Sequence, residues 1–559
     1  MRPEGKNQLD SLYFDYPLFE APARRAAAGE AEKTSVAIVG AGPVGLMAAL
    51  TLASFGIASV VFEKKNTFND GSRAICLARH SYHLFEKVGA LEPFLRKSLG
   101  WTKGRSYFRG KKILEFEMAH DRDQKFMPMY NLQQQYIEQF LWQAASKSAL
   151  IDIRWLSEAT SIGSDTDGVS IQVEDPSGVY QVRADWLLAA DGARSSVRAI
   201  RGLKLKGENY EGRYVIADVK ADLPVDPVHP TVRRALFDPV CLPGKTVLIH
   251  RQPDNIWRID YQIDDAVTIE HATKEEIVRA NVAGVLKEIG YAGNWELEWW
   301  SSYTANTLLL DDYRDGRIFF IGDSAHIVPI FGVRGLNNGL IDAFNIGWKI
   351  AMVASGAAGG GLLDSYTPER RGATLDVFEN ASKSARFMSP PTDGWRLMRD
   401  AALSLALDYE FAGEFANPRQ MTPYHYGASP ITVRSASIEP QRPEPGAVVP
   451  NVQLSNGRYF SDLLGLGFTG VAFSNADEKL VQDMRQLLTG LDRHSRLLRF
   501  GDERGGNDGS GAEARRIAAA FSAAPGDFVL IRPDMHIAAR WRNPELEKIR
   551  AALARMLNI

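Results

Sequence analysis

One stretch near the amino terminus, residues 35–65, constrains the fold more than any other part of the chain. It reads as a short apolar strand, a turn with Gly40, Gly42 and Gly45 in the G-x-G-x-x-G spacing, an apolar helix over 47–55 and a strand ending at Glu63. Gly40 permits the tight turn, Gly42 lets a pyrophosphate approach the backbone, and Gly45 lets helix and strand pack closely. Free N–H groups at a helix start attract phosphate, and Glu63 stands where a carboxylate accepts hydrogen bonds from ribose. The pattern predicts a dinucleotide-binding unit rather than an ordinary glycine-rich helix start.

The overall composition excludes several other classes of protein. The 559 residues exceed one compact domain, and 65 basic against 68 acidic residues give no sign of nucleic-acid binding. Cys76 and Cys241 lie far apart in the sequence, which argues against a disulfide framework or a structural zinc site, so no metal is predicted. The longest apolar run, 350–363, is too short for a bilayer span, and residues 1–34 lack the apolar core of a signal peptide. We therefore expect a cytoplasmic protein without membrane or nucleic-acid partners.

Two further strand ends carry polar motifs. Residues 187–198 form an apolar strand that ends in Asp191-Gly192 and leads into a basic, serine-rich helix start; alone, this could be a structural turn. Residues 317–338 repeat the arrangement with Gly322-Asp323, followed by a glycine-rich loop that opens a helix. Asp323 could accept hydrogen bonds from sugar hydroxyls, and the amides of 335–337 could stabilise negative charge on an electron-rich ring.

Taken in this order, the three segments resemble the class A flavoprotein monooxygenases, which have the para-hydroxybenzoate hydroxylase fold. The resemblance covers about residues 35–371. It implies an α/β protein in which a Rossmann-like FAD-binding domain is interleaved with a mixed β-sheet substrate domain. It also implies FAD as cofactor, NADH or NADPH as co-substrate, and a homodimer that hydroxylates a phenolic aromatic compound with O2 through a flavin C4a-hydroperoxide. The alternatives are a flavin-dependent oxidoreductase or halogenase acting on a non-phenolic substrate, and an FAD-binding interaction protein.

Individual family positions can be placed on this chain. Arg73 is similar to the family arginine near the FAD pyrophosphate, and Gln134 to the glutamine that contacts FAD, although the neighbouring residues 133 and 135 are also glutamine. Pro329 is similar to the proline that lines the flavin edge. The family pattern Pro-Pro-x-Gly-Gly-x-Gly here reads Pro-Ile-Phe-Gly-Val-Arg-Gly, so we expect a reshaped substrate side with Phe331 or Arg334 near the ring. The residues expected to bind FAD are Gly40, Gly42, Pro43, Val44, Gly45, Glu63, Lys64, Arg73, Gln134, Asp191, Gly322, Asp323, Pro329, Gly335, Leu336 and Asn337.

The sheet between the second and third motifs resembles the family's substrate wall. Alternation in 257–263 puts Arg258, Asp260 and Gln262 on one face, and Arg258 is similar to a family arginine close to the flavin. His250 ends the preceding strand, and a buried histidine could take a phenolic proton. We therefore expect catalytic groups among His250, Arg258 and Asp260; the alternative is a surface hairpin with ordinary charges.

The region after Gly446 resembles the thioredoxin-like C-terminal domain of the phenol hydroxylase and (hydroxyphenyl)propionate hydroxylase branch, through residues 527–541. A redox thioredoxin needs C-x-x-C after its first strand, whereas residues 474–477 contain no cysteine, so a structural or subunit-contact role is expected. The predicted organisation is an arm (1–34), an FAD-binding domain with an inserted β-meander (35–206), a substrate sheet (207–310), the return of the FAD-binding domain (311–422), a linker (423–450) and the thioredoxin-like domain (451–559).

Overall fold

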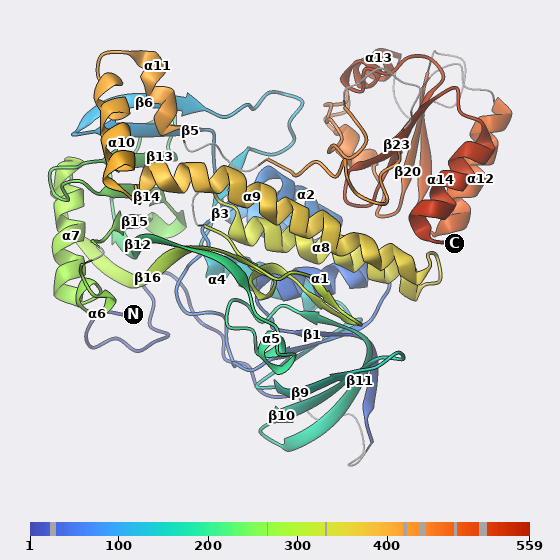
Figure 1. The fold of residues 1–559 in the computed structure, drawn as a ribbon, viewed down its shortest axis with the longest axis horizontal. Helices are drawn as coiled ribbons and strands as arrows, with labels where there is room; N and C mark the ends of the chain where they lie inside the picture. The colour runs from blue at the N-terminus through green and yellow to red at the C-terminus, as the bar shows by residue number, and fades with distance from the viewer. Residues whose placement is uncertain are drawn as a thin grey trace.

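The computed structural model describes residues 1–22, 30–264, 266–329, 332–417, 422–434, 443–473, 478–501 and 511–559. Figure 1 shows two large sheets joined by long helices, with the C-terminal part of the chain at one end. The mixed α/β architecture predicted from the sequence is confirmed.

The first sheet carries the glycine motif and has the strand order β17-β18-β11-β1-β2-β8. Its strands β1, β2, β8, β11 and β18 run parallel, as expected for a dinucleotide-binding unit. A hairpin of β9 and β10 extends antiparallel from β11, which forms the predicted meander. The bounds of these strands are β1 (Glu32–Val39), β2 (Ser59–Glu63), β8 (Ile151–Trp155), β9 (Glu158–Ser164), β10 (Val169–Asp175), β11 (Gly178–Ala189), β17 (Arg314–Asp315) and β18 (Ile318–Phe320).

Helices α1 (Pro43–Ser54), α4 (Gln134–Ala145) and α8 (Gly335–Ala354) pack together beside this sheet (Figure 1). Helix α1 is buried along most of its length because its sequence is apolar on every side. It begins at Pro43, four residues before the predicted start, since proline is well accommodated in a first helical turn. The buried strand and helix residues form one large core.

The second sheet has the order β19-β16-β12-β15-β14-β13-β5-β6. Two of its strands, β5 and β6, come from residues 103–117, inside the segment predicted to belong to the FAD-binding domain, because β13 pairs in parallel with β5. The substrate sheet is thus not confined to 207–310. Its strands are β5 (Lys103–Phe108), β6 (Lys111–Glu117), β12 (Lys206–Ala221), β13 (Val232–Phe237), β14 (Thr246–Arg251), β15 (Ile256–Gln262), β16 (Trp295–Leu309) and β19 (His326–Ile327).

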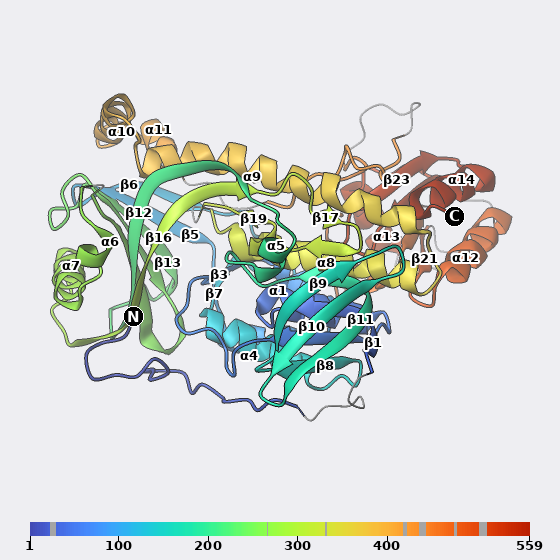
Figure 2. The same ribbon diagram turned by 60° about the horizontal axis from the view of Figure 1, so that its bottom comes forward.

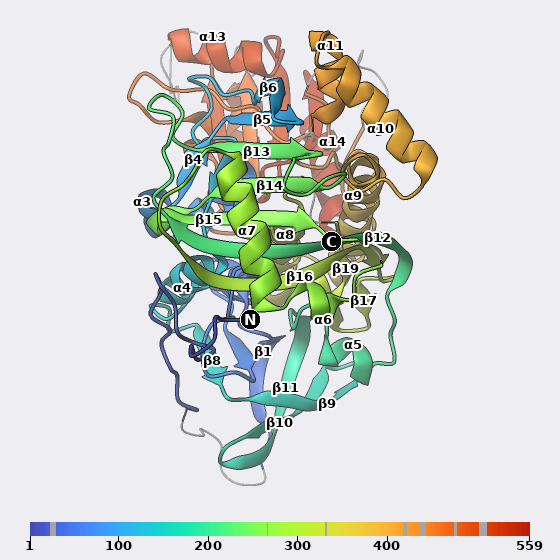
Figure 3. The same ribbon diagram turned by 90° about the vertical axis from the view of Figure 1, so that its left-hand side faces the viewer.

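The two faces of the second sheet differ in polarity. Alternate residues such as Val247, Ile259 and Tyr261 form an apolar core that is covered by α7 (Glu275–Glu288). Figure 3 shows α7 crossing this face of the sheet. The opposite face carries the charged side chains that the sequence predicted, and it is turned toward the first sheet.

The C-terminal region forms a separate sheet of order β21-β20-β22-β23. Along the chain the elements follow the order β-α-β-α-β-β-α, with β20 and β21 parallel and the remaining pairs antiparallel. Their bounds are β20 (Thr469–Phe473), α12 (Glu478–Leu491), β21 (Arg496–Phe500), α13 (Gly511–Ala520), β22 (Asp527–Ile531), β23 (Ile537–Arg542) and α14 (Leu546–Leu557). The thioredoxin-like assignment stays a prediction, and residues 474–477, at the predicted place of a C-x-x-C motif, lie outside the described residues.

The remaining elements connect these sheets. A small sheet joins β3, β7 and β4. Helix α9 runs beside α8 through the middle of Figure 1, and α10 and α11 lie at its upper left. Among the described residues, no helix has the length and apolar character needed to span a bilayer. The bounds are β3 (Cys76–Ala78), α2 (Arg79–Lys87), α3 (Leu91–Lys97), β4 (Leu99–Trp101), β7 (Met129–Asn131), α5 (Ser196–Ile200), α6 (Ile269–Ala272), α9 (Tyr366–Met388), α10 (Asp393–Leu405) and α11 (Glu410–Gly413).

The N-terminal arm runs from the second sheet toward the first (Figure 2). Arg2 is almost fully buried; it forms an ion pair with Glu298 on β16 and another, at 2.9 Å, with Asp70 in the loop after β2. Tyr16 accepts a hydrogen bond from the amide of Gly71 at 3.4 Å. The arm therefore links the substrate sheet to the loop that contains Arg73.

Candidate functional site

The glycine turn has the shape that a bound dinucleotide needs. A Cβ at Gly40, whose φ is +104°, would lie 2.6 Å from the carbonyl oxygen of Ala190, and one at Gly45 would lie 1.9 Å from that of Gly40. Gly42 differs, because a Cβ there would meet no atom of the described residues within 4 Å. Gly42 is also the N-cap of α1 and provides no side-chain cap, and the first turn holds no acidic residue. The turn thus leaves open space in front of uncapped helix amides, which suits a phosphate.

Glu63 closes one side of this turn. Its Oε2 accepts a hydrogen bond from the amide of Ala41 at 2.9 Å, and Oε1 accepts one from Lys65 at 3.0 Å. These bonds hold the carboxylate at the end of β2, beside the glycine turn, where the sequence predicted a ribose partner. Lys64 is exposed and lies 3.7 Å from a carboxylate oxygen of Glu158.

The two other strand-end motifs lie beside the glycine turn. Gly322 adopts φ +61° and packs closely against Val44 of α1. Asp323 comes next, and part of the residue is exposed. The protein atoms around its carboxylate displace water and raise its pKa, whereas the charges of His326 and Arg73 act to lower it. Asp191 accepts hydrogen bonds through Oδ2 from the start of α5, while its buried Oδ1 has no hydrogen-bond partner among the described residues.

The loop after β2 is held by Gln134. Its Oε1 accepts hydrogen bonds from the amides of Arg73 at 3.3 Å and Ala74 at 3.2 Å. The Arg73 side chain is exposed and contributes to the field at Asp323. Gln134 therefore touches the backbone of the predicted pyrophosphate loop, which favours it over the neighbouring glutamines as the predicted family position.

The start of α8 lies against residues 76–81, which follow the loop that contains Arg73. Asn337 accepts hydrogen bonds from the Ala78 amide at 2.8 Å and from Ser81 Oγ at 2.6 Å, and it donates to the carbonyl of Cys76 at 3.1 Å. The N-cap residue of α8 is Arg334, and its side chain caps no amide of the described helix start, which leaves Gly335 and Leu336 with free amides there.

The loop before α8 departs from the family pattern. Pro329 is buried, whereas Phe331, one of the residues expected near the ring, lies outside the described residues. Arg334 is buried and directs Nη1 to the carbonyl of Val377 at 3.4 Å. Val333 has φ +64°, which strains a β-branched residue, and it occupies a position where the family pattern has glycine.

The predicted catalytic residues share the polar face of the second sheet. His250 pairs with Arg258 across β14 and β15, and Asp260 lies two residues further along β15, so the predicted alternation is observed. Arg258 donates from Nε and Nη2 to Asp218 at 2.8 Å each, from Nη1 to the carbonyl of Arg73 at 3.1 Å, and from Nη2 to the carbonyl of Ser72. Arg258 therefore joins the second sheet to the loop after β2, and all three of its guanidinium nitrogens already donate hydrogen bonds.

Several other polar atoms on this face are buried without hydrogen-bond partners among the described residues. They include His250 Nδ1, Asp260 Oδ1, and both Nε and Nη1 of Arg233. Such atoms are rare in folded proteins and point to a ligand or bound water. Arg233 was missed in the sequence; alternation along β13 places it, like Ala235 and Phe237, on this face, opposite His250. The sequence signal that could have identified Arg233 was its charge, because it lies in the sheet predicted to be the substrate wall.

Burial controls the charge of this face. It lowers the pKa of His250 well below its usual value, with Arg233 and Arg258 acting in the same direction, so the imidazole is neutral near pH 7. Burial also raises the pKa of Asp260 to about 7, although Arg258 opposes the change. Arg258 is balanced by Asp218, whereas Nε and Nη1 of Arg233 have no hydrogen-bond partner in the part of the chain that the structure describes.

Comparisons with known proteins agree with this geometry. Residues 33–381 match the family described as FAD binding domain, and the chain belongs to this family. The chain is similar to the 3-(3-hydroxy-phenyl)propionate/3-hydroxycinnamic acid hydroxylase of Klebsiella pneumoniae (strain 342), with 29% identity over 67% of this chain and 66% of that protein. It is 26% identical to the protein of the same name from Escherichia coli O157:H7, over 90% of this chain and 91% of the other.

Solved structures show the same fold. The flavin-dependent monooxygenase PieE, in complex with FAD and substrate, superposes with a TM-score of 0.78 at 23% identity, over 94% of this chain and 99% of that one. Aklavinone-11 hydroxylase, in a ternary complex with FAD and aklavinone, gives a TM-score of 0.76 at 21% identity, over 95% and 100% of the two chains. The predictions of FAD as cofactor and of the flavoprotein monooxygenase fold are confirmed.

Proposed function

We propose that this protein is an NAD(P)H-dependent flavoprotein monooxygenase that hydroxylates a phenolic aromatic compound with O2. The observation that carries the proposal is the buried polar face of the second sheet, which lies against the pyrophosphate loop through Arg258. The hydroxyphenylpropionate and hydroxycinnamate hydroxylase names of the curated relatives support a phenolic substrate for this chain.

The side chains on that face can prepare a phenol for oxygen transfer. FAD, when bound, supplies the redox and oxygen chemistry. His250 is neutral, so its unpartnered Nδ1 can accept the phenolic proton when that nitrogen carries no hydrogen. Arg233 can then stabilise the phenolate oxygen or another anionic group, because two nitrogens of this buried cation have no hydrogen-bond partner among the described residues. The buried surroundings exclude water, which protects reactive oxygen chemistry.

The nucleotide end of the site has the groups that FAD requires. The open space at Gly42 and the start of α1 suit the pyrophosphate, and Glu63 suits the ribose of its ADP part. Asp323, Pro329 and the start of α8 are the proposed contacts of the ribityl chain and the ring. Pro43, Val44, Lys64, Arg73, Gln134 and Asp191 complete the proposed FAD set.

The test is NADH and NADPH oxidation by the FAD-loaded protein with a panel of phenols, hydroxybenzoates and hydroxyphenyl acids, with hydrogen peroxide measured in parallel. We expect at least one compound to accelerate oxidation and to give a hydroxylated product with little peroxide. The absence of stimulation by every phenol, in protein that retains FAD, would overturn the proposal.

Two variants separate the proposed roles on the polar face. Arg233→Met should raise the Kd of the active phenol, whereas His250→Gln should lower the rate of hydroxylation and change its pH profile while binding is largely kept. Ligand binding can be followed by the perturbation of the flavin absorption spectrum, without turnover. Unchanged binding in Arg233→Met would remove Arg233 from the substrate site.

We also propose that the protein is a cytoplasmic homodimer. The two free cysteines are compatible with a reducing compartment. The surface of α10, α11 and the turn that follows is unusually apolar: Leu397, Met398, Tyr409, Phe411 and Phe415 are each at least half exposed. Three aromatic side chains exposed to this extent give an apolar patch on the order of 300 Å², which is typical of an interaction site. Light scattering tests this: Phe411→Asp with Phe415→Asp should give monomers, and an unchanged mass would place the contact elsewhere.

A further inference from the structure

Buried charges join the C-terminal region to the helices of the FAD-binding domain. Arg532, at the end of β22, donates to both carboxylate oxygens of Glu369 on α9, at 2.5 and 2.8 Å, and to Asp534 at 2.6 Å. Lys349 on α8 donates to the same Glu369 at 2.7 Å. The four side chains are buried, so each charge depends on the others to offset the loss of hydration. This arrangement fixes the C-terminal region to α8 and α9.

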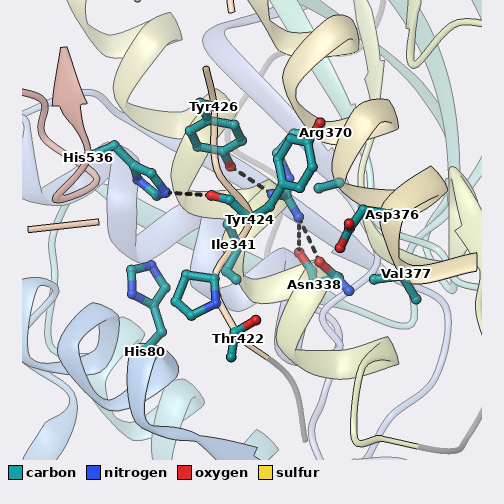
Figure 4. A pocket seen from close by; sticks show the side chains of 12 residues that line it. His80, Asn338, Ile341, Arg370, Asp376, Val377, Thr422, Tyr424, Tyr426 and His536 are labelled. Carbon is teal, nitrogen blue, oxygen red and sulfur yellow. Dashed lines mark hydrogen bonds between the residues drawn. The ribbon is translucent and has the colours of Figure 1, made fainter. Parts of the chain in front are cut away.

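A continuous set of contacts leads from this cluster to the turn before Asp323. The Arg532 guanidinium lies 4.9 Å from the centre of the Tyr426 ring. Arg370 donates from Nη1 to the Tyr426 hydroxyl at 2.7 Å and from Nε to Asp342 Oδ1 at 2.5 Å. The other oxygen of Asp342 accepts a hydrogen bond from the amide of Gly322 at 3.0 Å. Figure 4 shows the middle of this path, where Arg370 lies between Tyr426 and Asn338.

Asp342 is the member of the path that holds the turn. It is fully buried, which by itself would raise its pKa, but Arg370 and His326 lower the pKa to about 2 and keep the carboxylate ionised. His326 Nε2 lies 2.7 Å from Oδ2 of Asp342, and Arg370 holds Oδ1. An ionised carboxylate in the interior must stay near its cation, so a shift of Arg370 would displace Asp342. Because the Gly322 amide donates a hydrogen bond to Asp342, a movement of Asp342 would move this amide. Asp323 is the residue directly after Gly322.

We propose that the C-terminal region sets the affinity of the protein for flavin through this path, with Tyr426 and Arg370 as positioning residues. The Tyr426 hydroxyl holds one end of the Arg370 guanidinium, and Arg532 covers the Tyr426 ring. The proposal rests on the placement of the flavin at the Asp323 turn. It gives the C-terminal region a role in cofactor binding that needs no cysteine chemistry.

Tyr426→Phe tests the path because it removes only the hydroxyl that accepts from Arg370 and keeps the ring under Arg532. FAD is removed from the protein and titrated back, with quenching of protein fluorescence and the visible absorption band of the flavin as readouts. The lost hydrogen bond to a buried charge destabilises the path, and if part of that loss reaches the turn before Asp323, the Kd for FAD should rise about three- to tenfold. The absorption band should also shift, because the turn beside the ring relaxes.

Tyr82→Phe is the matched control. Its hydroxyl is also in a buried setting and donates to Ser98 Oγ at 2.6 Å, but it makes no contact with the path. Both variants should lose similar stability in urea unfolding of the FAD-free protein, and only Tyr426→Phe should change the Kd for FAD. Equal Kd values in wild type and Tyr426→Phe would overturn the proposal, as would equal changes in both variants.

Arg532→Lys provides a second, independent perturbation of the path. Lysine keeps the positive charge but loses the two-pronged contact with Glu369 and the planar group over Tyr426. We expect weaker FAD binding here too; an unchanged Kd would contradict the proposal. The titration follows FAD itself, so its result does not depend on which aromatic compound the enzyme hydroxylates.

Discussion

Replacement of Asp260 by asparagine tests the electrostatics of the substrate face most directly. Burial raises the pKa of Asp260 to about 7, about three pH units above that of a carboxyl group in an unfolded chain. Between about pH 4 and pH 7 the folded protein therefore binds more protons at this position than the unfolded protein does. Stability contributed by the neutral carboxyl is present at low pH and is lost as the pH rises through this window.

The size of the effect follows from the two pKa values. With about 3.9 in the unfolded chain and about 7 in the folded protein, linkage gives a loss of about 2.5 kcal/mol between pH 5 and pH 7.5. Asparagine has nearly the same shape and does not titrate, so Asp260→Asn lacks this loss. The stability of the variant relative to wild type should therefore rise by about that amount over the same pH range.

Urea unfolding of the FAD-loaded proteins at pH 5 and pH 7.5 measures this difference. Asp165→Asn serves as the control, because a hydrogen bond from Arg183 lowers the pKa of Asp165 to about 2 and the group is exposed, so it does not titrate in this window. A difference between wild type and Asp260→Asn that stays constant with pH would show that Asp260 is ionised throughout, and the assignment of its charge state would be wrong. The Kd of an anionic phenol gives a second readout, since ionised Asp260 repels it and its binding should weaken above pH 7.

Three other predictions concern the nucleotide end of the site. Gly45→Ala should abolish FAD binding in a fluorescence titration, because the new Cβ would lie 1.9 Å from the carbonyl oxygen of Gly40; tight binding would contradict the steric argument. Arg2→Met should weaken FAD binding and lower stability by about 3 kcal/mol, because it leaves Asp70 and Glu298 without their buried partner, and Arg2→Lys should recover part of both. Val333→Gly should raise stability in urea, because relief of about 1–3 kcal/mol of left-handed strain exceeds the entropic penalty of glycine, about 0.5–1 kcal/mol; a fall would mean that packing of the valine dominates.

Short-range rules account for the parts of the fold that the sequence predicted well. The glycine turn follows from sterics within six residues, since only glycine tolerates the approach of Gly45 to Gly40 and the positive φ of Gly40. The charged face of β15 follows from the two-residue period of a strand, and its apolar face from the same period in the residues between. In both cases the information lies within one turn or one strand.

Long-range pairing was harder to predict. Strands β5 and β6 join the second sheet although more than a hundred residues separate them from β13. The partner of a strand is set by tertiary packing, and no local sequence pattern specifies it. Asp342 illustrates the same limit: a single carboxylate in an apolar helix signals a buried partner, but the sequence does not show that the partners are Arg370 and the Gly322 amide.

The face of β15 that carries Arg258 was predicted correctly from the sequence, but the role of this residue was not determined by its position on that face. Its charge and position suggested that it activates the phenol, yet its guanidinium is bound to Asp218 and to the carbonyls of Ser72 and Arg73. These bonds hold β15 against the loop after β2, and they would therefore set the distance between the proposed substrate and flavin sites. Arg233, whose Nε and Nη1 have no hydrogen-bond partner among the residues that the structure describes, is better placed to contact an anionic group of the proposed substrate. Both arginines are buried and charged, so the charge alone does not separate their roles. A buried arginine whose nitrogens already have protein partners holds parts of the structure together, whereas one with unpartnered nitrogens is available to bind a ligand.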